Sequence, residues 1–151
     1  MKHRTQRAAL AVLGALLALA YAPDTAHAKS PRPLTFIAIM NGGQVVPPST
    51  SNALGVGFLT FDNQTKRLCY SLTYSGLLGT ETDSHLHGDA LPGQTSAILF
   101  DMAPYGSPKV ACLGPLKSNE ERLLKQEKMY IQIHTDIFVA GEIRGQVLSI
   151  R

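Results

Sequence analysis

Three histidines have the spacing best suited to chemistry in this chain. His85 and His87 stand two residues apart in a β-like segment, 84–88, and the period of two in a strand turns both imidazoles to the same face. His134 ends a second β-like segment, 129–134, whose opposite face is apolar and consists of Met129, Ile131 and Ile133. Because His134 is not forced into the core, it is free to approach the other two.

Three converging neutral imidazoles would suit copper or zinc, and an all-nitrogen site ranks copper highest in affinity. If positions on the metal stay open, such a site could also support redox chemistry. The same spacing fits a second interpretation, in which His85, His87 and His134 hydrogen-bond to the backbone and to one another as a polar plug. The spacing alone leaves both interpretations open.

A second polar group lies in the segment 141–146, Gly-Glu-Ile-Arg-Gly-Gln. Alternation along a strand would place Glu142, Arg144 and Gln146 on one face, where the carboxylate and the guanidinium can pair. Near His134, the pair would form an outer layer that orients an imidazole or binds an anionic ligand. The alternative is a purely structural role in the last strand.

Other catalytic arrangements find no support in the sequence. It has no G-x-S-x-G nucleophile elbow, no C-x-x-C pair and no glycine-rich phosphate loop that opens a helix. The sequence therefore favours a protein that is not an enzyme, and copper-dependent redox chemistry is the one activity that it leaves open.

The first 28 residues predict a secretory signal peptide. Three basic residues precede an apolar run at 8–20, and Ala-His-Ala at 26–28 supplies the small residues that signal peptidase needs. The apolar run is too short to cross a bilayer as a helix. We expect export to the periplasm or the extracellular space, a flexible leader at 29–33, and a single domain at 34–150 without a membrane span.

Cleavage after Ala28 would also change the charge. It removes three basic residues and Asp24 from 14 basic and 11 acidic ones, which leaves 11 and 10. A nearly neutral domain lacks the clustered positive charge that binds phosphate backbones, so nucleic acid is not an expected partner. The expected partner is a protein or a surface ligand.

Cys69 and Cys112 are the only cysteines, and an exported chain meets an oxidising compartment. One disulfide between them is the economical prediction, worth on the order of 4 kcal/mol for a loop of about forty residues. Two free buried thiols are the alternative.

Most of the chain has the pattern of short β-strands. Alternation at 68–74 predicts that one face, which carries Leu68, Tyr70, Leu72 and Tyr74, packs in the core. In contrast, Ser118 and Glu121 resemble a capping box and predict a short helix at 118–127 that covers one end of the fold. Short strands separated by turns favour a β-sandwich or barrel; the other candidates are 34–40, 54–62, 84–88, 96–101, 109–113, 128–135 and 142–150.

Four segments, in this order, resemble the chordin-type (CHRD) domain family. They are Met-Asn-Gly-Gly-Gln-Val-Val-Pro-Pro at 40–48, Ser-His-Leu-His-Gly-Asp-Ala at 84–90, Met-Tyr-Ile-Gln-Ile-His-Thr at 129–135 and Gly-Glu-Ile-Arg-Gly-Gln-Val at 141–147. The resemblance covers about 34–150 and implies an exported domain with no general enzymatic activity. The fold it implies is all-β, an immunoglobulin-like or Greek-key sandwich or barrel. The chain departs from the family where Ile-Phe-Val-Ala at 137–140 replaces the usual Asn-Pro.

A looser resemblance connects His85, His87 and His134 with copper-zinc superoxide dismutases, which hold copper with a His-x-His pair and a later strand histidine. Those enzymes need a further bridging histidine and a zinc subsite, and no other histidine follows residue 28. The sequence therefore predicts an exported, non-catalytic binding or structural module. The alternative is a metalloprotein with a three-histidine copper or zinc site, active in metal handling or redox chemistry.

Overall fold

The computed structural model describes residues 32–150 of the 151-residue chain. The predicted signal peptide and most of the predicted leader, at 29–33, therefore lie outside the described residues. Arg32 and Pro33 are exposed and have no regular secondary structure. Over 32–150, no helix is long and apolar enough to cross a membrane.

Short strands dominate the described chain, as the alternation predicted. In chain order the elements are β1 (Leu34–Asn41), the 3-10 turn η1 (Gly42–Gln44), β2 (Leu54–Asp62), β3 (Arg67–Ser75), β4 (Glu81–Gly88), β5 (Ile98–Asp101), β6 (Lys109–Leu113), α1 (Ser118–Lys125), β7 (Met129–Thr135), β8 (Ile143–Gln146) and β9 (Leu148–Ser149). The strand predicted at 142–150 is interrupted at Val147. On one side of the break, β8 pairs with β7 and, at one position, with β1, and on the other side β9 pairs with β1 alone.

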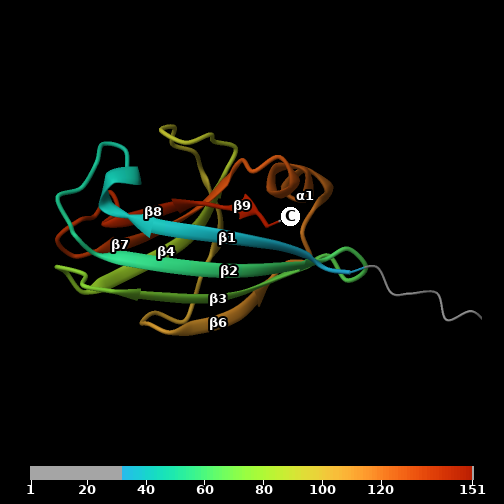
Figure 1. Cartoon of the computed structure of the whole chain (residues 1–151), viewed down its shortest axis with the longest axis horizontal. Coiled ribbons are helices and arrows are strands. Elements are labelled where there is room, and N and C mark those ends of the chain that lie inside the picture. Colours follow the sequence, from blue (N-terminus) through green and yellow to red (C-terminus); the bar gives the residue numbers. More distant parts are fainter. Residues whose placement is uncertain (1–31, 151) are drawn as a thin grey trace, which may run out of the picture. The chain divides into compact units, whose positions relative to one another are not determined.

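All strands pair antiparallel in a single sheet of order β5-β4-β7-β8-β1-β2-β3-β6, with β9 beside β1. The sheet curls into a nearly closed, barrel-like arrangement. In Figure 1, β1, β2, β3 and β6 form the near layer, and β8, β7 and β4 lie behind it. The core lies between these layers and includes Phe36, Leu59, Leu72, Leu86 and Ile131. The predicted all-β fold with one short helix is confirmed, and the immunoglobulin-like Greek key stays a prediction.

A buried ion pair helps to close the barrel between β6 and β4. Lys109 on β6 is 2 % exposed and pairs with Glu81 on β4, and its Nζ also donates to Ser84 Oγ at 2.8 Å. Strand periodicity did not reveal this pair, since it joins strands that do not follow each other in the chain.

The helix begins at Ser118, and its cap therefore lies one residue earlier than predicted. Lys117 occupies the N-cap position, and its backbone N–H donates to Glu120 at 2.7 Å, so the capping box predicted at Ser118 and Glu121 is wrong by one residue. Glu121 is instead 2.9 Å from Lys66 Nζ, in the β2–β3 turn. Through this contact and the buried Leu123 and Leu124 on its inner face, α1 packs against one end of the sheet.

The predicted disulfide joins Cys69 on β3 to Cys112 on β6. The two residues are direct partners in the register of these antiparallel strands. The bond therefore ties the edge strand β6 to the sheet, and the alternative of two free thiols is wrong.

Candidate metal site

Strands β4 and β7 bring the three histidines together. These strands are neighbours in the sheet, with His85 opposite Gln132, His87 opposite Tyr130 and Asp83 opposite His134. Their alternate residues, such as Leu86 and Ile131, are buried in the core. The predictions that His85 and His87 share a face, and that His134 lies outside the apolar core, are confirmed.

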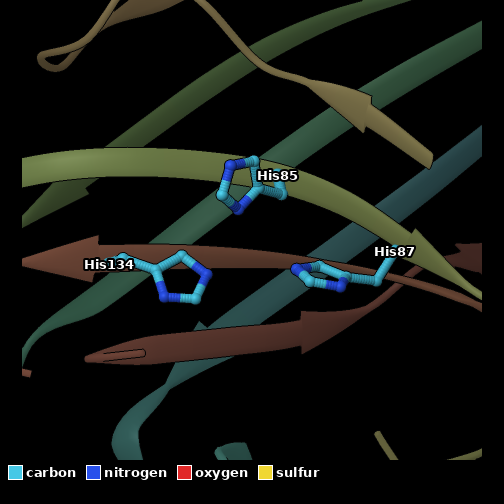
Figure 2. A group of neighbouring side chains, drawn as sticks. All are labelled: His85, His87 and His134. Carbon is cyan, nitrogen blue, oxygen red and sulfur yellow. The ribbon is translucent and has the colours of Figure 1, made fainter. Parts of the chain in front are cut away.

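The three imidazoles form a compact cluster. Ring centroids are 5.6 Å apart for His85 and His87, 5.1 Å for His85 and His134, and 6.2 Å for His87 and His134. One ring nitrogen of each residue lies within 4.8 Å of the other two. Figure 2 shows a nitrogen of His87 and one of His134 facing each other, with a nitrogen of His85 pointing toward the space between them.

A metal ion would require only a small contraction of this cluster. Three points so close share a centre no more than about 2.8 Å from each, whereas a zinc–nitrogen bond measures about 2.0–2.1 Å. An inward shift of less than about 1 Å for each ring would therefore bring all three nitrogens into bonding range.

Backbone carbonyls fix the orientation of two of the rings. His87 Nδ1 is 3.0 Å from the carbonyl oxygen of Ser96, and His134 Nδ1 is 2.9 Å from that of Val139. A carbonyl can only accept, so each Nδ1 carries the proton and each Nε2 is left with its lone pair. Both Nε2 atoms are buried and have no hydrogen-bond partner in the described part of the chain.

His85 completes the pattern through its other nitrogen. Its Nδ1 is buried and has no partner within the described residues. Its Nε2 lies 3.4 Å from Asp101 Oδ1 and 3.8 Å from Asp83 Oδ1. Each of the three histidines therefore has one nitrogen turned to protein oxygens and one nitrogen available to a ligand.

Burial lowers the pKa of His87 and of His134, and the neighbouring imidazole of His85 lowers both further, although the backbone carbonyls of Ser96 and Val139 oppose this. The neutral form that these shifts favour is also the form that binds a metal.

The predicted outer residues, Glu142 and Arg144, lie in two different places. The carboxylate of Glu142 accepts hydrogen bonds from Ser51 Oγ at 2.6 Å, Leu78 N at 2.6 Å, Thr135 Oγ1 at 2.8 Å and Gly79 N at 3.3 Å. It does not pair with Arg144, because β8 begins only at Ile143 and strand alternation does not extend back to Glu142.

Arg144 lies near the cluster, where its positive charge also lowers the pKa of His87. Its guanidinium carbon is 3.6 Å from the ring centroid of Tyr130. The ring of Tyr130 in turn stacks on His87, with centroids 4.6 Å apart and planes 3° from parallel. Alternation along β7 placed Tyr130 on the histidine face, but the stacking depends on register and was missed.

A comparison with protein families matches residues 36–147 to the CHRD domain. The chain belongs to the CHRD domain family. The matched region of this CHRD protein contains all three histidines and the segment 141–147, so the resemblance seen in the sequence is confirmed. No curated protein and no solved structure matches the chain.

Proposed function

We propose that this CHRD protein is an exported, non-catalytic binding module and that it binds copper or zinc through His85, His87 and His134. The observation that carries the proposal is the set of three buried ring nitrogens that converge without hydrogen-bond partners among residues 32–150. Buried polar atoms are normally satisfied, and one metal ion would satisfy all three at once.

The hydrogen-bonded plug accounts less well for this arrangement. A plug would use its inner nitrogens to bond to one another, whereas the inner nitrogens of His85, His87 and His134 have no partner. The contacts of His87 and His134 with backbone carbonyls instead correspond to the outer hydrogen bonds that orient metal-binding histidines.

Copper is the first choice of metal, because it has the highest affinity for nitrogen ligands among the common divalent ions. A site of three imidazoles leaves a further position for water or a small ligand. Binding and transfer of the metal need no other residue, and redox chemistry at the open position is the alternative use of the same site.

Export rests on two features. The signal peptide predicted at 1–28 would direct the chain to the periplasm or the extracellular space, and the Cys69–Cys112 disulfide suits an oxidising compartment. The immunoglobulin-like Greek key implied by the family resemblance would also suit a module in this setting.

The test is a titration of untagged protein, purified from the periplasm, with Cu²⁺ and with Zn²⁺. We expect one equivalent of copper to bind, with an electron paramagnetic resonance spectrum that shows coupling to imidazole nitrogen. The double variant His85→Ala, His87→Ala should lose both. Thr82→Ala, at an exposed position of β4 outside the cluster, is the matched control and should bind as the unchanged protein does.

Stoichiometric copper binding that persists in the folded double variant would refute the site. Failure of the unchanged protein to bind either metal would refute the metal function altogether. In that case the histidines serve packing, and the loops carry recognition of a partner.

A further inference from the structure

A pocket of about 420 Å³ opens on the outer face of β8. Its walls come from two stretches that are distant in sequence: η1 with the segment that follows it, and the connection between β4 and β5. The walls are mostly apolar and include Val45, Val46, Pro48 and Pro92. Arg144 and Gln146, neighbours on one face of β8, contribute the polar part of the lining. The volume is in the range of small-molecule sites, which combine apolar walls with few polar groups.

Arg144 is only 1 % exposed, and neither of its terminal nitrogens has a hydrogen-bond partner in the described chain. The ring of Tyr130 stabilises the guanidinium through its face, but this contact leaves the in-plane N–H donors unused. Burial lowers the pKa of Arg144, although a guanidinium keeps its proton at neutral pH. The pocket therefore contains a buried positive charge that no carboxylate of the described chain neutralises.

Gln146 offers the opposite kind of group. Its Nε2 donates to the carbonyl oxygens of Ala90 at 2.9 Å and Glu127 at 2.7 Å. Because carbonyls only accept, these contacts fix the orientation of the amide. Its Oε1 is buried and accepts no hydrogen bond from any described residue. The residues that line the pocket thus offer one unused acceptor as well as the unused donors of Arg144.

We propose that this pocket binds a small organic carboxylate that also carries a hydrogen-bond donor, such as a hydroxyl group, on a compact apolar body. The carboxylate would accept two parallel hydrogen bonds from Arg144, the geometry for which a guanidinium is best suited. The hydroxyl would donate to Gln146, and the apolar body would contact the valine and proline walls. A single buried cation among apolar walls favours a monoanion of this kind over a phosphate.

This site is separate from the metal site. Tyr130 lies on β7, between its neighbours β4 and β8. Its ring contacts His87 of β4 and Arg144 of β8. The proposed carboxylate therefore does not need a metal, and the two proposals can fail independently.

The experiment is a nuclear magnetic resonance titration of ¹⁵N-labelled protein, kept metal-free with a chelator, with mandelate as the probe. We expect saturable shifts of the amide signals of Gly43 and Gly93, which line the pocket. Mandelamide, which keeps the body and the hydroxyl but has no charge, should produce no such shifts. Phenylacetate, which lacks the hydroxyl, should bind more weakly than mandelate.

Arg144→Met should weaken mandelate binding at least about tenfold, because it removes charge-assisted hydrogen bonds. Thr82→Ala, at an exposed position of β4, should bind mandelate as the unchanged protein does. Absence of saturable shifts with mandelate, equal binding of mandelamide, or unchanged binding by folded Arg144→Met would each overturn the proposal. Should Arg144→Met fail to fold, the comparison of mandelate with mandelamide on the unchanged protein decides the question. Equal binding of phenylacetate would overturn the role of Gln146.

Discussion

Replacing Glu142 with glutamine should destabilise the fold by about 2 kcal/mol at pH 7. The carboxylate is fully buried, and each of its oxygens accepts one backbone N–H and one hydroxyl: Leu78 and Ser51 on one oxygen, Gly79 and Thr135 on the other. A glutamine amide keeps only one of these two acceptor oxygens and places an NH₂ group where the other one was. Its NH₂ group must face the backbone N–H of either Leu78 or Gly79.

The size of the effect depends on which carboxylate oxygen has the weaker hydrogen bonds, and this is the oxygen that contacts Gly79 and Thr135. The hydroxyl of Thr135 can turn to accept a hydrogen bond, whereas the N–H of Gly79, already at 3.3 Å, cannot. We therefore expect the NH₂ group to replace the oxygen that faces Gly79. The charge-assisted hydrogen bond from the Gly79 N–H is then lost, and such a bond contributes about 1.5–3 kcal/mol. Replacement by alanine should cost more, because the buried side chains of Ser51 and Thr135 would then face a cavity.

The effect should also depend on pH. Burial opposes ionisation of Glu142, but hydrogen bonds from Ser51, Leu78, Thr135 and Gly79 outweigh it and lower the pKa of the carboxyl below its usual 4.5. A carboxyl group whose pKa is lower in the folded state than in the unfolded state stabilises the fold. This stabilisation is complete above the unfolded-state pKa and is lost as the pH falls through the folded-state pKa. The difference between the unchanged protein and Glu142→Gln should therefore narrow below about pH 4.5.

Urea unfolding between pH 7 and pH 3 measures this difference directly, with the midpoint shifted and the slope m unchanged. Glu120→Gln is the matched control: its side chain caps the N–H of Lys117, glutamine can accept the same bond, and we expect a change below about 0.5 kcal/mol. A loss below about 0.5 kcal/mol for Glu142→Gln, or a loss that stays constant down to pH 3, would refute the reasoning.

Three further changes should each affect stability in a way that urea or thermal unfolding can measure. Glu81→Gln leaves Lys109 buried beside a neutral partner and should lower the free energy of unfolding by about 3–5 kcal/mol. The double change Glu81→Leu, Lys109→Met removes both charges and should recover much of this loss. No recovery would contradict the assignment of a buried charge. Reduction of the Cys69–Cys112 disulfide, which spans 43 residues, should cost about 4 kcal/mol, and an unchanged midpoint in reductant would show that the bond does not stabilise the fold. Gly145→Ala places a Cβ about 2.6 Å from a backbone oxygen of β1 and should lower the free energy of unfolding by about 1–3 kcal/mol. An unchanged free energy of unfolding would mean that β1 and β8 can move apart to accommodate the methyl group.

The sequence determined the local structure and part of the site. Alternation placed Leu68, Tyr70 and Leu72 on the core face of β3, where they are buried. The same rule put His85 and His87 on one face, because successive side chains of a strand point to opposite sides. With only two cysteines in the chain, the pairing of the disulfide was also determined once the cysteines were expected to be oxidised.

Strand order and register decided the rest. They placed His134 beside His85, and brought the carboxylate of Glu142 to Ser51, which is 91 residues away in sequence. They also left Arg144 buried under the walls of a pocket, where alternation alone suggested an ion pair with Glu142. Periodicity reports only which face of its own element a side chain occupies. Which other element covers that face depends on contacts between distant segments, and these exist only in the folded chain.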